Sequence, residues 1–225
     1  MQSAEVRGII WDLDGTLVDT SELHFHAWTA LARELQRPLS RQVFEATFGR
    51  RNPEIIRDLF GADLLDKEVS RLGDRKEEFY RNEAKKGMDL LPGARALLQE
   101  LQDNRFKQAI GSSAPRANVD LIIDLTRTGG YFSAVVSMED TQKGKPDPQV
   151  FRVAAHRLGV RPERCLVIED AAAGVQAAKA GRMKCIAVRS AGHHSEDSLK
   201  RAGADLVVDT LESLSIRVIR EVMSR

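Results

Sequence analysis

The chain has 225 residues, of which 42% are hydrophobic, which is enough for one large domain or for a core with a smaller insert. Its 34 basic and 33 acidic side chains leave a net charge of +1, which excludes a bulk charge that would attract nucleic acid or a membrane surface. No apolar run approaches the ~20 residues that span a bilayer, and the N-terminus lacks a signal-peptide pattern, so we expect a cytoplasmic protein.

The first predicted element is a buried strand that ends in two aspartates. Within residues 6–20, VRGIIWDLDGTLVDT, the apolar residues Ile9, Ile10 and Trp11 precede Asp12 and Asp14. Side chains alternate along a strand, so both carboxyl groups start on one face at its C-terminal end. Carboxylates crowded in this way need a cation or a shared proton, because repulsion and desolvation both disfavour their charged forms.

The segment 21–89 is predicted to be an all-helical insert. Asp19 or Thr20 can cap its first helix, whose apolar residues recur at helical spacing as far as Pro38. Further helices are expected over 41–48, 53–60 and 66–86, and the segment contains no convincing strand pattern.

From Leu91 onwards, helix and strand patterns alternate, which predicts a parallel sheet with right-handed crossovers. The predicted helices are 93–103, 116–125, 149–158, 173–180 and 211–223. The predicted strands are 107–110, 134–137, 166–169, 185–188 and 205–208. We therefore expect an α/β fold in which residues 1–20 and 90–225 form a Rossmann-like core and residues 21–89 form the helical insert.

Two pairs of residues are predicted to have no chemical role. Cys165 and Cys185 each begin an apolar, strand-like run, and two cysteines can form neither a disulfide framework nor a zinc site, so we expect buried thiols. His193 and His194 lack further ligands at a metal-binding spacing, so we place them in an exposed loop.

The remaining polar motifs all follow predicted strands, and parallel sheets bind ligands beyond the carboxyl ends of their strands. Ser112 and Ser113 follow the strand that ends at Ile110, Lys145 lies in a loop after the next strand, and Glu169 and Asp170 close another. Each motif alone can be a turn or a helix cap. Together they favour one site whose carboxylates require a hard cation, and Mg²⁺ suits carboxylates combined with a phosphate.

In order and spacing, DLDGTLVDT and these later motifs resemble the four motifs of the haloacid dehalogenase-like (HAD) phosphohydrolase superfamily over nearly the whole chain. The resemblance implies that Asp12 is a nucleophile that forms an aspartyl-phosphate and that Asp14 is the general acid and base. It also implies that carboxylates of Asp12 and Asp170 and the backbone carbonyl of Asp14 bind Mg²⁺. Glu169 is expected to act on the metal through a water molecule.

The same resemblance assigns the groups that bind the transferred phosphoryl. Lys145 is expected to neutralise its oxygens, and the Ser112 hydroxyl and backbone amides near Ser113 to donate hydrogen bonds to them. The helix that starts at Arg116 is expected to direct its N-terminus at the same place.

A helical insert between the first and second motifs is similar to that of the group containing β-phosphoglucomutase, sugar phosphatases and phosphoglycolate phosphatase, where it acts as a lid. Within the insert, His24, Arg51 and Lys76 resemble substrate-contacting positions, although either Arg50 or Arg51 can be the relevant arginine. Alternatively, His24 is a partly buried histidine without a role in binding, and the arginines and Lys76 belong to a solvated, charged face.

One departure from the family pattern distinguishes a phosphatase from a mutase. Where β-phosphoglucomutases carry a Ser-Lys-Asn-like run that binds a second phosphate, residues 114–117 read APRA. We therefore predict a monomeric phosphatase that hydrolyses a small phosphorylated metabolite, with no nucleic-acid or membrane partner. A phosphoglucomutase-type enzyme is the alternative, and a catalytically inactive binding or regulatory protein is the third candidate. Against the third stands the presence of Asp12, Asp14, Lys145 and Asp170.

Overall fold

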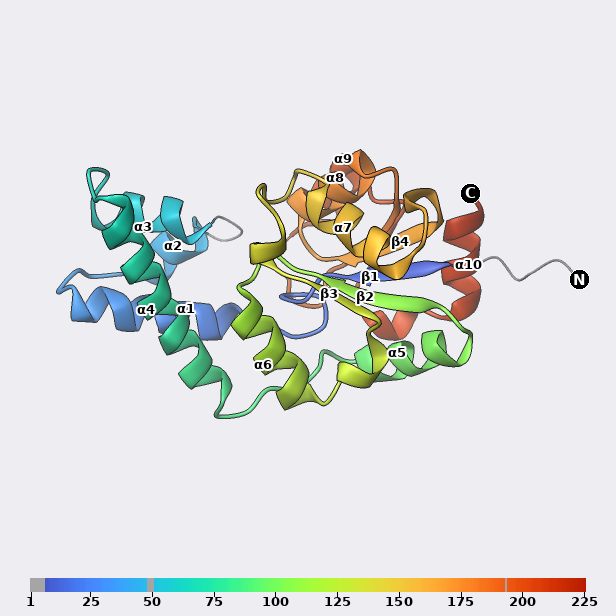
Figure 1. Cartoon of the computed structure of the whole chain (residues 1–225), viewed down its shortest axis with the longest axis horizontal. Helices are drawn as coiled ribbons and strands as arrows, with labels where there is room; N and C mark the ends of the chain where they lie inside the picture. The colour runs from blue at the N-terminus through green and yellow to red at the C-terminus, as the bar shows by residue number, and fades with distance from the viewer. Residues whose placement is uncertain (1–6, 48–50, 193) are drawn as a thin grey trace, which may run out of the picture. The chain divides into compact units, whose positions relative to one another are not determined.

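The computed structural model describes residues 7–47, 51–192 and 194–225, and the chain divides into two compact units (Figure 1). One unit comprises Met1–Asp19 and Asp89–Arg225, and the other comprises Thr20–Met88. These limits lie within one residue of the predicted core and insert. Within the described ranges, no helix is both long and apolar enough to cross a membrane.

The first unit is built on one parallel sheet. Among the described residues this sheet has six strands, in the order β3-β2-β1-β4-β5-β6, and every neighbouring pair is parallel. The strands are β1 (Gly8–Trp11), β2 (Lys107–Gly111), β3 (Ala134–Val136), β4 (Cys165–Glu169), β5 (Lys184–Val188) and β6 (Leu206–Val208). The strand order reverses between β1 and β4, which is the position where such sheets bind ligands. The predicted Rossmann-like core is confirmed.

Helices cover both faces of this sheet (Figure 1). They are α5 (Ala94–Asp103), α6 (Arg116–Thr126), α7 (Gln149–Leu158), α8 (Ala172–Ala180), α9 (Glu196–Ala202) and α10 (Ile216–Ser224). Helices α7 and α8 pack on the face that carries Ile10, Val167 and Cys185. Cys165 and Cys185 are buried, as predicted, and burial raises the pKa of the Cys165 thiol to about 12.

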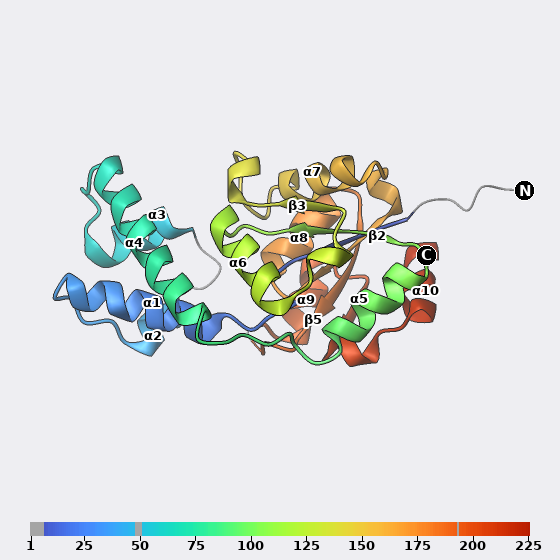
Figure 2. The same ribbon diagram turned by 60° about the horizontal axis from the view of Figure 1, so that its bottom comes forward.

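The opposite face of the sheet contains a satisfied polar pair beneath α5. Trp11 is fully buried, and its Nε1 donates to Gln108 Oε1 at 3.0 Å, while Gln108 Nε2 donates to the Leu98 carbonyl of α5 at 2.9 Å. Figure 2 shows α10 beside α5, and the Ile216 amide of α10 donates to Glu100 at 3.3 Å. Every side-chain polar atom of Trp11 and Gln108 therefore has a hydrogen-bond partner, and burying the pair leaves no polar atom unsatisfied.

The second unit is helical throughout its described residues. It contains α1 (Ser21–Glu34), α2 (Arg41–Glu45), α3 (Asn52–Phe60) and α4 (Asp66–Ala84). Its own apolar core includes Trp28, Leu31, Phe44, Ile56 and Leu72. Each observed helix starts within one residue of its prediction, whereas α1, α2 and α4 end earlier than predicted. Phe48, the predicted end of α2, lies outside the described residues.

The predicted single helix over 211–223 was wrong. The structure has a 3-10 turn, η4 (Leu211–Ser213), followed after a break by α10. Ser215 adopts an extended conformation at the break, and its hydroxyl accepts from the Val218 amide at 3.5 Å, which caps α10. The capping serine therefore starts a new helix where apolar periodicity alone suggested continuity.

Helix α9 was not predicted, because the segment around His193 and His194 was interpreted as a loop. The Ser195 hydroxyl accepts from the Ser198 amide at 3.2 Å and begins this helix, and Gly203, with φ of +104°, ends it. His194 is partly buried just before the cap, and His193 lies outside the described residues. The remaining 3-10 turns are η1 (Gly129–Tyr131), η2 (Met138–Asp140) and η3 (Pro162–Arg164).

Candidate active site

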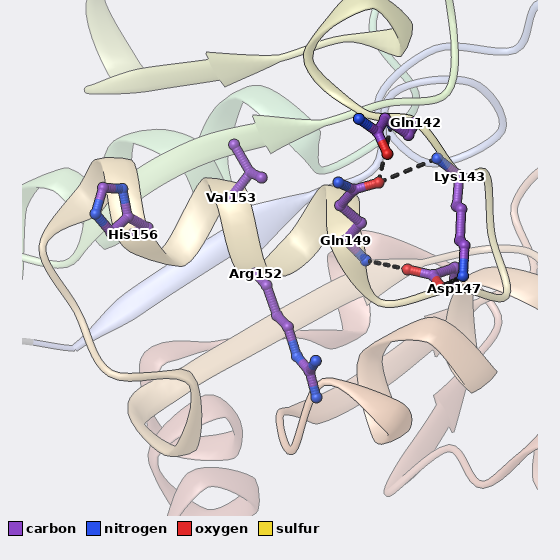
Figure 3. Close-up of a pocket in the computed structure, with 7 residues that line it drawn as sticks. All are labelled: Gln142, Lys143, Asp147, Gln149, Arg152, Val153 and His156. Atoms are coloured by element: carbon purple, nitrogen blue, oxygen red, sulfur yellow. Dashed lines mark hydrogen bonds and ion pairs between the residues drawn. The ribbon is translucent and has the colours of Figure 1, made fainter.

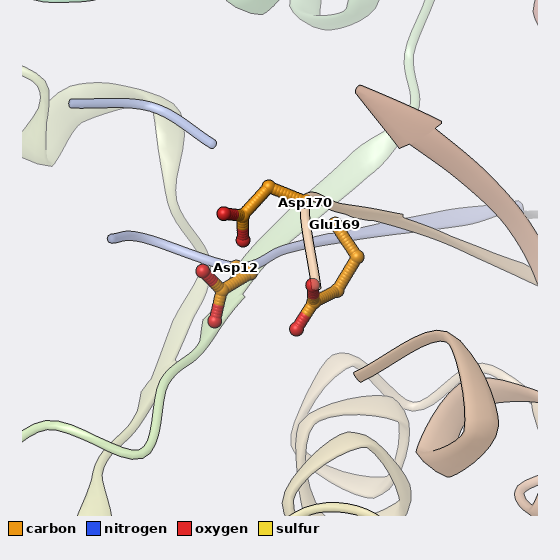
Figure 4. A group of neighbouring side chains, drawn as sticks. All are labelled: Asp12, Glu169 and Asp170. Atoms are coloured by element: carbon orange, nitrogen blue, oxygen red, sulfur yellow. The ribbon is translucent and has the colours of Figure 1, made fainter. Parts of the chain in front are cut away.

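Three buried carboxyl groups meet where the strand order reverses. The Asp12 amide donates to the Ile168 carbonyl at 2.9 Å, so the chain leaving β1 stays beside the end of β4. Figure 4 shows the side chains of Asp12, Glu169 and Asp170 directed toward one another. One ligand oxygen from each lies within 4.8 Å of the others. The sheet therefore brings together acids that are more than 150 residues apart in the sequence.

Gly15 allows the chain after Asp12 to pass close to Asp170. Its φ is +83°, and a Cβ at this position would lie 2.1 Å from Asp170 Oδ2. The Gly15 amide donates to the Val18 carbonyl at 2.7 Å, which closes the turn that carries Asp14. A side chain here would impose both backbone strain and a collision with the acid cluster. The turn after Asp14 therefore depends on glycine both for its backbone conformation and for its close approach to Asp170.

Glu169 is held by the start of α8. Its Oε2 accepts from the Ala171 amide at 2.5 Å, and its side chain is only 2% exposed. A Cβ at Gly174, in the first turn of α8, would lie 1.6 Å from Glu169 Oε1. The absence of a side chain at Gly174 therefore makes the space for this carboxylate. Gly174 was not among the predicted site residues, although a glycine five residues after Glu169 is visible in the sequence.

Lys145 joins the ends of β1 and β4. Its buried ammonium donates to Asp12 Oδ1 and, at 2.7 Å, to Glu169 Oε1. The same ammonium lies 4.8 Å from the centre of the Phe151 ring of α7. Burial alone would lower the pKa of Lys145, but the two carboxylates outweigh it and raise this pKa, so the ammonium stays charged. The predicted convergence of Lys145 on the acid motifs is seen in the structure.

One ammonium does not balance the carboxyl groups around it. Burial raises the pKa of Asp12 to about 7, with contributions from Glu169 and Asp14 that Lys145 opposes. Burial, followed by the charges of Glu169 and Asp12, also raises the pKa of Asp170 well above its ordinary value. These groups repel one another as anions, and a divalent cation among them would relieve that repulsion.

The donor set fits Mg²⁺. Its side-chain ligands are all carboxylate oxygens, which hard cations prefer. The Thr16 hydroxyl, two residues after Asp14, is buried and has no hydrogen-bond partner among the described residues. Buried polar atoms are normally satisfied, so this hydroxyl indicates a place that a ligand or its hydration completes.

The loop after β2 places Ser112 and Ser113 beside the cluster, because Trp11 of β1 pairs with Ile110 of β2. The Ser112 hydroxyl is buried and accepts from the Ala114 amide at 3.0 Å. The Arg116 guanidinium binds Asp120, one turn along its own helix, at 2.7 Å. The Arg116 amide donates to both carboxylate oxygens of Glu139, at 2.9 and 3.1 Å. Glu139 was not among the predicted site residues.

In the helical unit, Lys76 lies inside a polar cluster. It is only 1% exposed, and its ammonium lies 2.8 Å from both Glu77 Oε1 and His24 Nδ1. Because an ammonium only donates hydrogen bonds, Nδ1 of His24 is the acceptor when Lys76 is charged. Asn52 Nδ2 donates to Glu77 Oε1 at 2.6 Å. The solvated-face alternative is therefore wrong for Lys76.

The other predicted residues of the helical unit are less informative. His24 is partly buried and stacks on Tyr80 with ring centres 4.5 Å apart. Arg51 is partly buried and occupies the N-cap position of α3. Arg50 lies outside the described residues, so the choice between these arginines is open. Contact of His24, Arg51 and Lys76 with a substrate stays a prediction.

A hollow of about 430 Å³ lies against α7 and the loop before it (Figure 3). There Gln149 Oε1 accepts from the amides of Gln142 and Lys143 at 2.9 and 3.0 Å. These bonds hold the loop that leads to Lys145. The lining contains none of the clustered acids.

Comparison with known proteins agrees with this geometry. Residues 9–188 match the family model described as haloacid dehalogenase-like hydrolase. The chain is 33% identical to a β-phosphoglucomutase of Bacillus subtilis over 96% of its own length and 95% of that protein. It is 28% identical to a phosphorylated carbohydrates phosphatase of Thermotoga maritima, over 97% of this chain and all of that one. A solved β-phosphoglucomutase of Clostridium difficile superposes with a TM-score of 0.85 at 25% identity and covers 97% of both chains.

Gly174→Ala tests the space reserved for Glu169. Because the added methyl would overlap the carboxylate, we expect the free energy of unfolding to fall by about 2 kcal/mol. Gly130→Ala is the matched control, since a Cβ there meets nothing within 4 Å and the change should be close to neutral. Urea unfolding of both variants measures the difference, and equal stabilities would contradict the proposed close contact.

The Lys76–Glu77 pair predicts a non-additive response to mutation. Lys76→Met leaves the Glu77 carboxylate in buried surroundings without its ammonium, so we expect a loss of about 3 kcal/mol in unfolding free energy. The double variant Lys76→Met/Glu77→Leu removes both charges and should recover part of that loss. Urea titrations of the single and double variants give the coupling energy. A double variant no more stable than Lys76→Met would argue against the pairing.

Proposed function

Since the chain belongs to the haloacid dehalogenase-like hydrolase family, we propose that it is a Mg²⁺-dependent phosphatase acting on a small phosphate monoester, such as a sugar phosphate, through an aspartyl-phosphate. The observation that carries the proposal is the position of Lys145, whose ammonium binds both Asp12 and Glu169 at the switch point of the sheet. The relatives named as phosphatases support the hydrolytic reaction.

In the proposed reaction the Asp12 carboxylate must approach a phosphate ester that is also negatively charged. An Asp12 oxygen forms a bond to phosphorus as the bond from phosphorus to the alkoxide oxygen breaks. Lys145 lies against Asp12 Oδ1 and is therefore placed to neutralise phosphoryl oxygens beside the nucleophile. Carboxylates of Asp12 and Asp170, with the Asp14 backbone carbonyl and the nearby Glu169, would hold Mg²⁺. When bound, the ion would supply further positive charge at the phosphoryl group.

Asp14 is the group we assign to proton transfer. Its position in the turn closed by Gly15 puts it close enough to contribute to the pKa of both Asp12 and Asp170. In the first step Asp14 gives its proton to the leaving alkoxide. In the second it takes a proton from the water that attacks phosphorus, and the bond from phosphorus to Asp12 breaks.

The loop after β2 completes the phosphoryl site. Because the Ser112 oxygen already accepts from the Ala114 amide, its own hydrogen can be donated to a phosphoryl oxygen. Amides near Ser113 add further donors. In the helical unit, His24, Arg51 and Lys76 are proposed to contact the remainder of the substrate and so to set specificity.

Phosphoryl transfer by a mutase is the second candidate, and the Bacillus subtilis relative favours it. Against it stands the run Ala114, Pro115 and Arg116, which offers no hydroxyl or lysine for a second phosphate. A binding protein that has lost catalysis is disfavoured because Asp12, Lys145, Glu169 and Asp170 are not only present but brought together.

Assay of a panel of sugar, polyol and carboxylic-acid phosphates with Mg²⁺ tests this function through the phosphate released. We expect one compound to be hydrolysed well above the rest, and chelation of the metal to stop turnover. Asp12→Asn should lower kcat about a thousandfold or more, because it removes the nucleophile. Asp209→Asn, which changes an exposed carboxylate, is the control and should leave the rate unchanged.

Formation of glucose 6-phosphate from β-glucose 1-phosphate without phosphate release would instead establish the mutase. Folded protein that turns over no compound of the panel would favour the inactive binding protein.

A further inference from the structure

A carboxylate of the chain itself occupies the anion position at the start of α6. Both oxygens of Glu139 accept from the Arg116 amide, the first of the helix, at 2.9 and 3.1 Å. The first amides of a helix lack intrahelical partners and carry positive partial charge, so they are the natural place for an anion. Pro115, just before the helix, has no amide hydrogen to offer a second one.

The segment that carries Glu139 is fixed from three directions. The Met138 amide donates to the Ala114 carbonyl at 2.9 Å, which attaches η2 to the loop before α6. Asp140 Oδ2 accepts from the amide and hydroxyl of Ser137 at 2.9 and 3.1 Å. Arg157 of α7 pairs with Asp140 and donates to the Val135 carbonyl at 2.6 Å. Glu139 is therefore presented on a braced turn and not on a free loop.

Asp140 carries its charge at neutral pH, as its ion pair with Arg157 requires. The hydrogen bond from Arg157 lowers the pKa of Asp140 to about 2, so Asp140 remains ionised and bound to the arginine. The free energy that this pair contributes is present above the ordinary aspartate pKa and is lost only as the pH falls toward 2.

The Glu139 carboxylate lies at the α6 end of the loop that begins with Ser112 and Ser113. Arg116 is the fourth residue after Ser112, so their Cα atoms lie no more than about 14 Å apart, and the Ser112–Ala114 hydrogen bond of 3.0 Å turns the loop and shortens that span. The Arg116 guanidinium does not compensate the Glu139 charge there, because it binds Asp120 at 2.7 Å. The start of α6 therefore carries a carboxylate on its first amide that the Arg116 guanidinium does not neutralise.

From this arrangement we propose that Glu139 is a specificity residue that restricts the enzyme to substrates with a single phosphate. The inference rests on the proposed phosphatase function. A second phosphate that approaches α6 meets the Glu139 carboxylate where the helix would otherwise have bound it.

Glu139→Gln is the decisive variant, because the amide keeps an oxygen that can accept from the Arg116 amide while the charge is removed. We compare kcat/KM for fructose 6-phosphate and fructose 1,6-bisphosphate, together with the preferred monophosphate of the panel. The ratio of bisphosphate to monophosphate turnover should rise about tenfold, as removal of one nearby like charge predicts. Glu163→Gln is the matched control. Glu163 is an exposed acid in η3, just before the start of β4, whereas the acid cluster lies at the end of that strand.

An unchanged ratio in Glu139→Gln, with monophosphate turnover retained, would overturn the inference and leave the phosphatase function intact. An equal rise in Glu163→Gln would also overturn it, because net charge and not position would then be responsible. Wild-type protein that hydrolyses no monophosphate would overturn the proposed function, and this inference with it. Thermal unfolding of each variant verifies that the compared proteins are folded.

Discussion

The interaction on which the site depends is the Lys145 ammonium held between Asp12 and Glu169. Both acids are nearly fully buried, and burial of like charges at the ends of two adjacent strands is unfavourable unless a cation lies between them. The lysine comes from neither strand but from the loop before α7. Its ammonium therefore connects this loop to the ends of β1 and β4. The carboxylates still outnumber the ammonium, and the remaining negative charge suits a divalent cation.

Close packing around this point depends on positions that have no side chain. Gly15 allows the turn after β1 to approach Asp170, and Gly174 allows the first turn of α8 to approach Glu169. At both places the backbone runs close to a carboxylate, and only glycine has no side chain that would collide with it. The acids and the glycines are thus one arrangement, in which the backbone is shaped around the charges.

The two units solve the same physical problem in different ways. In the core, the Lys145 charge lies among acids that we assign to catalysis. In the helical unit, the Lys76 charge is buried beside Glu77 and His24, within 5.4 Å of the ring centres of Trp28 and Tyr80. A lysine in such surroundings is shielded from solvent, and its charge is balanced by the neighbouring carboxylate.

The sequence by itself determined the parallel α/β core, the helical insert and the residues of the acid site, because strand ends of a parallel sheet share one edge and each motif follows a predicted strand. It did not identify Gly174, because the 1.6 Å distance between an added Cβ and Glu169 Oε1 arises only after α8 has packed against β4. It did not identify Glu139 either, because the contact of this carboxylate with the Arg116 amide arises only after η2 has packed beside α6. It also could not decide whether Lys76 was exposed, because charged residues surround it in the chain while aromatic rings surround it in space. Apolar periodicity overrode the capping serines at 195 and 215, and so α9 was missed and α10 was merged with η4. Local pattern fixes which residues leave a strand end, but only tertiary packing decides which distant group meets them, because that choice depends on distances between segments remote in the chain.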